Sequence, residues 1–143
     1  MPQKELLLID LSARLFYGVK VCIKIPNHQE KIFEEQIGDL KELTRYGGYL
    51  VNSKGIDYRS FNLDIKPYLR PMSSMTEEEN KKRIQLGILR AINSNHEMIF
   101  DGFGNESVDT QLRALDWLNA HHFDYRGLIE KGLALEAPKD MYK

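Results

Sequence analysis

Apolar and polar positions near the start of the chain follow the period of an amphipathic helix. Leu7, Leu11 and Leu15 recur every four residues and fall on one face of a helix over 4–17. Gly18 comes next and is placed to end that helix in a left-handed turn. The pattern therefore predicts an N-terminal helix with an apolar stripe directed at the core. The polar positions expected to face water are Lys4, Asp10, Ser12 and Arg14.

Alternation of period two predicts a strand over 19–25. Its apolar set is Val19, Val21, Ile23 and Ile25, and its other set is Lys20, Cys22 and Lys24. This places Cys22 beside lysines, on the face away from the main core, and Pro26-Asn27 ends the strand. Neighbouring lysines favour a reactive thiolate, but no histidine lies near Cys22 in the sequence. We therefore interpret Cys22 as an ordinary strand residue.

Three further segments of this half carry weaker strand signals. Residues 61–66 alternate, and 47–51 is predicted as a strand followed by a turn at 52–55. The apolar side of the alternating segment is Phe61, Leu63 and Ile65. The segment 29–45 is ambiguous, because its apolar residues are spaced by three, which suits neither a clean strand nor a long helix.

The second half of the chain is predicted to be mainly helical. Thr76 followed by Glu79 forms the capping-box pattern that begins a helix, and Ser107 is placed to cap another. Between them, 93–106 contains glycine and asparagine and is predicted as a loop. The apolar positions of the two helices are Ile84, Ile88 and Ala91, and Val108, Leu112, Leu115 and Leu118. The start, the cap and the end expected for a short last helix are Tyr125, Asp124 and Gly132.

The order of elements is one helix, several strands and then helices, and segregated elements of this kind predict an α+β fold. We expect an N-terminal helix, a small antiparallel sheet and C-terminal helices packed on it. The length of 143 residues suits a single domain over 1–143. Its sheet-rich part is expected at about 19–66 and its helical part at about 76–133.

Composition limits the classes of function and the cellular compartments that the sequence suits. The net charge is −1, whereas proteins whose whole surface binds nucleic acid are usually strongly basic. Cys22 is the single cysteine, so no disulfide forms within the chain, which suits a reducing compartment. The start of the chain lacks the pattern of a signal peptide, and its apolar run at 6–9 is too short to cross a bilayer. We therefore expect a cytoplasmic protein without membrane contact.

The densest chemistry lies at 116–128, which holds the single tryptophan and two of the four histidines. His121 and His122 follow Trp117 and Leu118 by four residues, so on a continuing helix each would contact the residue one turn before it. A histidine beside a carboxylate can act as a general base or a metal ligand. The other residues considered with this pair are Asp116, Asp124 and His96. No spacing typical of a metal site is present, so the structural interpretation is a helix–turn–helix corner.

Residues 68–75, which we call the link, connect the two halves of the chain and are a candidate binding edge. The link contains Tyr68, Arg70 and Met72, and methionine and arginine suit protein interfaces. Basic and aromatic residues could instead form a stacking platform for single-stranded nucleic acid. They are Lys54, Arg59, Lys66, Arg70, Lys81, Lys82 and Arg83, with Tyr49, Tyr58 and Phe61. Against this platform, the acids at 77–79 are expected to pair with the basic residues at 81–83 along a solvated helix face.

Long motifs cover residues 10–15, 17–19, 66–79, 116–119 and 123–133. In these motifs the chain resembles a family of small uncharacterised bacterial proteins associated with phages and mobile elements of gut bacteria. The family has no assigned activity. The resemblance therefore implies a bacterial accessory gene and implies nothing about chemistry.

These observations favour a small non-enzymatic adaptor or accessory protein that binds a protein partner, with no cofactor and no metal. An apolar surface near the link or near the tryptophan would be required. The residues predicted to take part are Tyr68, Arg70, Met72, Trp117, His121, His122, Asp124 and Arg126. Two alternatives stay open. One is a metal-dependent or His/Asp hydrolase built on His121, His122 and Asp124, and the other is a nucleic-acid-binding protein.

Overall fold

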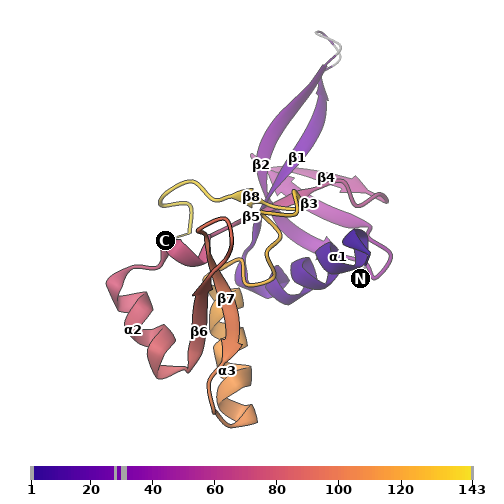
Figure 1. Ribbon diagram of the computed structural model, residues 1–143. Helices are drawn as coiled ribbons and strands as arrows, with labels where there is room; N and C mark the ends of the chain where they lie inside the picture. Colours follow the sequence, from indigo (N-terminus) through magenta and orange to yellow (C-terminus); the bar gives the residue numbers. More distant parts are fainter. Residues whose placement is uncertain (1, 28, 30–31, 143) are drawn as a thin grey trace. The chain divides into compact units, whose positions relative to one another are not determined.

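The computed structural model describes residues 2–27, 29 and 32–142 of the chain. Its helices and strands confirm the α+β class predicted from the order of elements (Figure 1). No helix among the described residues is long and apolar enough to span a membrane. The chain divides into two compact units, which we call the first and the second unit. They are Met1–Tyr68 with Leu133–Leu135, and Leu69–Gly132 with Glu136–Lys143.

The first unit begins with the predicted helix. It comprises α1 (Gln3–Arg14) and a 3₁₀ turn, η1 (Leu15–Tyr17), and Gly18 ends it in the left-handed region at φ +72°. Leu7 and Leu11 are buried, as the apolar stripe requires. The helix and its end are therefore confirmed.

The expectation that Asp10 and Arg14 face water is wrong, because both side chains are fully buried. The guanidinium binds the carboxylate through two hydrogen bonds, Nε to Oδ2 at 3.0 Å and Nη2 to Oδ1 at 3.1 Å. Positions 7, 10, 11 and 14 share one helix face, so the buried stripe includes this charged pair. Charged side chains tolerate such burial only when they are paired.

The main sheet is an antiparallel meander whose fifth strand returns to pair with the first. Its strands are β1 (Lys20–Asn27), β2 (Ile32–Leu43), β3 (Tyr49–Ser53), β4 (Ile56–Ser60) and β5 (Lys66–Leu69), with the short β8 (Leu135–Glu136). The strand order is β4-β3-β2-β1-β5-β8. Figure 1 shows β1 and β2 as a long hairpin, paired from Lys20 opposite Asp39 to Asn27 opposite Ile32.

The strand predicted over 19–25 is confirmed, and its first three apolar residues are buried. Cys22 does not lie on an open face, because its side chain is also buried and is hydrogen-bonded by Tyr68. Burial and this hydrogen bond raise the pKa of Tyr68 to about 12. The face expected to point away from the core is therefore covered at Cys22 by an aromatic side chain.

The ambiguous segment 29–45 contains the longest strand, β2, which has 12 residues. Only Gly38 and Leu40 of this strand are buried, so its outer half has no core-facing period. A bulge between Leu40 and Glu42 then shifts the register against β3. These two features explain why neither helical nor strand periodicity was visible.

The two strands predicted at 47–51 and 61–66 have opposite outcomes. The strand expected at 47–51 is confirmed as β3, and the turn after it is Lys54-Gly55, with positive φ at both residues of a two-residue hairpin loop. The strand expected at 61–66 is wrong, because β4 ends at Ser60 and β5 begins only at Lys66. Phe61, on the alternating pattern, is 84% exposed. Alternation without a neighbouring strand does not make a strand.

The helix predicted from the capping box at Thr76 and Glu79 is confirmed as α2 (Glu77–Gln85), with both hydrogen bonds of the box formed. It is shorter than predicted, because Gly87 lies in the left-handed region at φ +72° and ends it. The apolar stripe expected to continue through Ile88 is therefore wrong, since a strand begins there.

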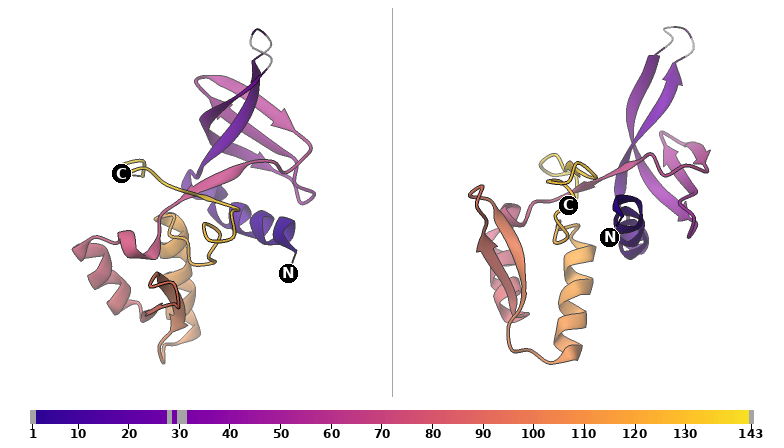
Figure 2. Two further views of the ribbon diagram at one scale, coloured as in Figure 1. Left: turned by 45° about the horizontal axis from the view of Figure 1, so that its top comes forward. Right: turned by 45° about the vertical axis from the view of Figure 1, so that its right-hand side comes forward.

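A β-hairpin replaces most of the loop predicted at 93–106. Its strands, β6 (Ile88–Ile92) and β7 (Met98–Phe103), pair with each other and with no other strand of the described chain. The glycine within β7 has a positive φ at an irregular step in the register, so the loop-like signal belongs to a bulge. The helix α3 (Val108–Ala120) then begins at the predicted cap, Ser107. Figure 2 shows α2, the hairpin and α3 from two sides.

The core of the second unit gathers around one face of α3. Its buried members are Met72, Ile88, Ala114, Leu118 and Phe123. The apolar stripe predicted for this helix holds at Leu118 but is wrong at Val108 and Leu112, which are exposed. The small residue Ala114 takes the buried position instead, which lets neighbouring elements approach the helix closely.

The short helix predicted after Asp124 is wrong. The chain there forms turns, with Gly127 and Gly132 at positive φ. Asp124 nevertheless binds backbone as a cap would, because its carboxylate accepts hydrogen bonds from the N–H groups of Leu128 and Ile129 at 2.8 and 3.0 Å. Two glycines in left-handed conformations leave no room for a regular helix between them.

We expect Arg14→Ala to lower the free energy of unfolding by about 3–5 kcal/mol, because the buried Asp10 carboxylate loses its guanidinium. The double variant Asp10→Leu/Arg14→Met removes both charges and should be less destabilised than Arg14→Ala. The matched control is Arg113→Ala, which breaks an ion pair of the same i, i+4 spacing that is 72% exposed on both sides. That change should cost about 0.5 kcal/mol or less. Urea denaturation measures all three, and equal losses for the two single variants would contradict the prediction.

Candidate functional site

Arg70 joins two segments of the second unit that lie far apart in the sequence. Its N–H donates to the carbonyl of His122 and its carbonyl accepts from the N–H of Asp124, both at 2.8 Å, in a parallel bridge with Phe123. Its guanidinium lies over the Phe123 ring, 4.3 Å from the centroid. Arg70 of the link is therefore bonded to the turn around His121 and His122, which we call the histidine corner. These were two separate candidates in the sequence.

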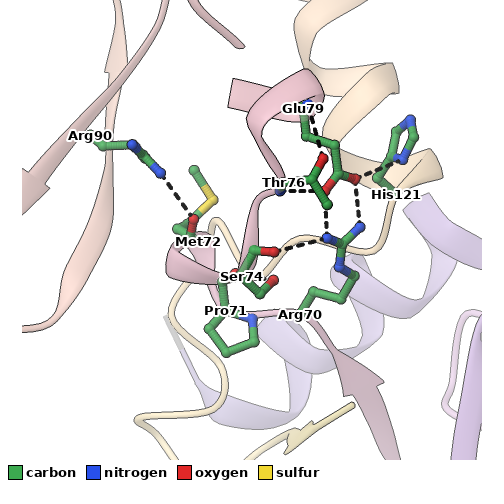
Figure 3. A network of polar contacts seen from close by, with 8 residues as sticks. All are labelled: Arg70, Pro71, Met72, Ser74, Thr76, Glu79, Arg90 and His121. Atoms are coloured by element: carbon green, nitrogen blue, oxygen red, sulfur yellow. Dashed lines mark hydrogen bonds and ion pairs between the residues drawn. The ribbon is translucent and has the colours of Figure 1, made fainter. Parts of the chain in front are cut away.

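Figure 3 shows the Arg70 guanidinium facing the carboxylate of Glu79. Nη1 donates to Oε2 at 2.7 Å and Nη2 to Oε1 at 2.6 Å, and Nη2 also donates to the Ser74 carbonyl at 3.2 Å. Oε1 accepts a further bond from the N–H of Thr76 at 2.9 Å. Burial alone would raise the pKa of Glu79, but the hydrogen bonds from Arg70 and Thr76 outweigh it and lower the pKa to about 2. The pair is a structural clamp that leaves Arg70 little capacity for a ligand.

His121 stands at the C-terminal end of α3, beside this ion pair. Its Nδ1 lies 3.5 Å from Oε2 of Glu79, and its ring packs against Trp117 with centroids 4.9 Å apart. Burial lowers the pKa of His121, while Glu79 raises it and Arg70 lowers it. Because the net shift is downward from 6.5, the imidazole is mainly neutral at pH 7. The side chain is 42% exposed, so it forms part of the surface.

His122 is directed into a different environment. It lies in the left-handed region at φ +60°, is only 2% exposed, and stacks on Tyr142 with ring centroids 3.9 Å apart. The Asp124 carboxylate is bound to backbone N–H groups of the following turn. Of the three residues of the hydrolase hypothesis, His121 thus lies beside Glu79, His122 stacks on Tyr142 and Asp124 binds backbone N–H groups. Across residues 2–27, 29 and 32–142, no three His, Cys, Asp or Glu side chains form a group that could hold a metal ion.

The remaining predicted residues are spread over several environments. Met72 lies in the buried core of the second unit, whereas Tyr68 belongs to the first unit. Trp117 is half-buried against Phe123, and Arg126 lies over the Tyr125 ring, 4.7 Å from its centroid. The two further residues considered with the histidines, both exposed, are Asp116 and His96.

Sequence reasoning missed two parts of this site. Glu79 was assigned only to the helix cap, although its carboxylate also binds Arg70. The segment 136–142 carried no assignment, yet the N–H of Ala137 donates to the carbonyl of Leu69 at 2.7 Å, next to Arg70. The available signal was Tyr142, the one aromatic residue of this segment, which stacks on a buried histidine.

Two open hollows border this cluster, and the residues lining both belong to the second unit. The acidic hollow, of about 630 Å³, is lined by Glu78, Glu79, His121 and the segment 136–142, together with Arg70. The second hollow has a volume of about 940 Å³ and a mixed lining, and we call it the apolar groove after its aliphatic and aromatic residues. Its charged lining residues include Glu97, Arg126, Glu130, Lys131 and Glu136. Its main apolar lining residues are Met72, Ile92, Met98, Phe100, Tyr125 and Ile129. Pro71 and Glu136 line both hollows, which therefore meet at these residues.

Comparison with known proteins gives no match to a family model, to a curated protein or to a solved structure. The resemblance to proteins of phages and mobile elements therefore stays a prediction.

The residues considered for nucleic-acid stacking differ in their availability. Tyr49 is 7% exposed and donates a hydrogen bond to Asp64, and burial together with this bond raises its pKa to about 12. Arg59 is paired with Glu42, whereas Phe61 is exposed. Phe61, directly after β4, is thus open to solvent, whereas Tyr49 of β3 is not.

We expect the Arg70–Glu79 pair to make stability depend on acid pH. The pKa of Glu79 is about 2 in the folded protein and 4.5 ordinarily, so its contribution is complete above pH 4.5 and is lost as the pH falls toward 2. Glu79→Gln should lower the free energy of unfolding by up to about 3 kcal/mol at neutral pH. Urea denaturation from neutral to acid pH should show the gap between variant and wild type closing between pH 4.5 and 2.

The control for this prediction is Glu78→Gln, which neutralises the neighbouring exposed acid. Glu78 forms no ion pair with another described residue, so its variant should show no gap of this kind. A gap for Glu79→Gln that stays constant through the acid range would contradict the prediction.

Proposed function

We propose that the protein is a small non-enzymatic binding protein that holds a segment of a partner protein in the apolar groove of its second unit. The observation that carries this proposal is the groove, whose wall combines Met98 with the aromatic rings of Phe100 and Tyr125. Methionine adapts to irregular apolar surfaces, and aromatic residues are enriched where proteins associate.

The hairpin that forms one wall of the groove supports an extended conformation for the bound segment. Ile92, at the end of β6, is 67% exposed, and Ile99 of β7 is also exposed. Neither strand pairs with a third strand in the described chain, so each has an edge along which an extended peptide could add. Exposed apolar side chains beside an open strand edge are typical of surfaces that bind another chain.

The polar cluster beside the groove supports a binding rather than a catalytic role. The Arg70 guanidinium and the Glu79 carboxylate bind each other, and Asp124 binds backbone N–H groups. His121 is directed at Glu79 and His122 stacks on Tyr142. These groups hold the walls of the hollows in place, which is the requirement for a preformed binding surface.

The cellular setting is part of the same proposal. We place the protein in the bacterial cytoplasm as an accessory protein of a phage or mobile element. The sequence resemblance and the single cysteine support this setting.

A random-peptide display selection against the intact protein tests the function. We expect enriched peptides to carry apolar residues and to bind Ile92→Glu roughly tenfold more weakly than wild type, since a carboxylate would enter the apolar groove. Leu112→Glu is the matched control, because Leu112 is similarly exposed on α3 and does not line the groove. Enriched peptides that bind Ile92→Glu as tightly as wild type would contradict the proposal, and so would a selection without enrichment.

A further inference from the structure

The acidic hollow is adjacent to the apolar groove, and its charge specifies the partner more closely. Pro71 and Glu136 line both hollows, so a segment that leaves the groove past these residues comes within reach of the acidic hollow. We infer that the partner segment carries a lysine or arginine whose side chain occupies the acidic hollow. This inference rests on the proposed function, because it names the chemistry of the segment that the groove holds.

The balance of charge in the acidic hollow favours a cation. Its lining contains four carboxylates, and its cationic side chains are Arg70 and Lys139. The carboxylates are those of Glu78, Glu79, Glu136 and Asp140. Arg70 is neutralised by Glu79 through two short hydrogen bonds, and Asp140 has interactions of its own, which leaves Lys139 against Glu78 and Glu136. A basic side chain entering the hollow therefore meets a surplus of negative charge.

Two of these acids are available to a ligand. Neither Glu78 nor Glu136 forms an ion pair with another described residue, and both are exposed. His121 does not cancel their charge at pH 7, because burial holds its pKa below 6.5. A lysine or arginine head group can thus meet carboxylates that no other side chain already holds.

The remaining lining suits the long aliphatic stem of such a side chain. Pro71, Pro138 and Met141 supply apolar surface, and Tyr142 supplies a ring. The ring is held in place by its stack on the buried His122. Lysine and arginine bury their methylene groups against apolar surface while the charged head stays near water or an acid. A hollow with apolar walls and acidic rims matches this division.

The test uses the intact protein and two small probes of nearly equal shape. N-acetyl-arginine amide carries the guanidinium, and N-acetyl-citrulline amide replaces it with a neutral urea. Both are titrated into ¹⁵N-labelled protein while amide chemical shifts are followed. We expect the arginine probe to shift the amide signals of residues 78–79, 121, 136–137 and 139–142, and the citrulline probe to leave them unchanged. Raised salt should weaken the arginine effect.

A charge-matched pair of variants locates the site. Glu78→Gln/Glu136→Gln should weaken binding of the arginine probe roughly fivefold or more, because two attractive carboxylates are lost. Asp101→Asn/Asp116→Asn removes the same charge from exposed positions outside both hollows and should leave binding unchanged. Equal shifts with citrulline, or unchanged binding by the first variant, would overturn the inference.

The inference and the proposed function can fail separately. Peptides enriched against the groove without a lysine or arginine, together with no response to the arginine probe, would overturn the inference and leave the proposed function standing. A specific arginine response without any enriched peptide would support the cation site and overturn the proposed function.

Discussion

The ion pair between Arg70 and Glu79 is the interaction on which the surface of the second unit depends. The backbone of Arg70 is bound to His122 and Asp124, and its guanidinium is enclosed between the Phe123 ring and the Glu79 carboxylate. Glu79 also accepts the N–H of Thr76 at the start of α2. One arginine therefore connects the beginning of α2 with the turn after α3. The planar guanidinium is suited to this position, because it can stack on a ring and bind a carboxylate with two parallel bonds.

The ion pairs Asp10–Arg14 and Arg70–Glu79 differ in how far they are buried. In α1 the Asp10–Arg14 pair is fully buried, so its desolvation cost is high and its geometry must be kept. The Arg70–Glu79 pair is 17% and 15% exposed, so it keeps some contact with solvent and gains from additional backbone hydrogen bonds. The first pair stabilises a helix within a core. The second positions segments at the surface, where a hollow can form beside it.

Local signals in the sequence predicted the structure well, and signals that depend on distant partners did not. Gly18, Ser107 and the capping box at 76–79 act within a few residues, and the structure confirms each. The hairpin of β6 and β7 was missed because its glycine lies in a bulge, which a sequence cannot distinguish from a loop. The strand expected at 61–66 failed for the opposite reason, since its alternation has no neighbouring strand to pair with. For the site, Arg70 and His121 were among the predicted residues, but Glu79 and Tyr142 as their surroundings required the tertiary structure.

Most side chains of the histidine corner are buried. Phe123 and His122 are buried, and Asp124 binds the backbone of its own turn, so the histidine corner builds a support. The surface that this support creates is made of residues without any catalytic signature, such as Pro71 and Glu136. In the proposed binding role, recognition would rest on shape and charge, supplied by the apolar groove and the neighbouring acidic hollow. For that role, a support held by hydrogen bonds and an ion pair would lower the entropy cost of binding, because fewer side chains would have to be ordered when a partner binds.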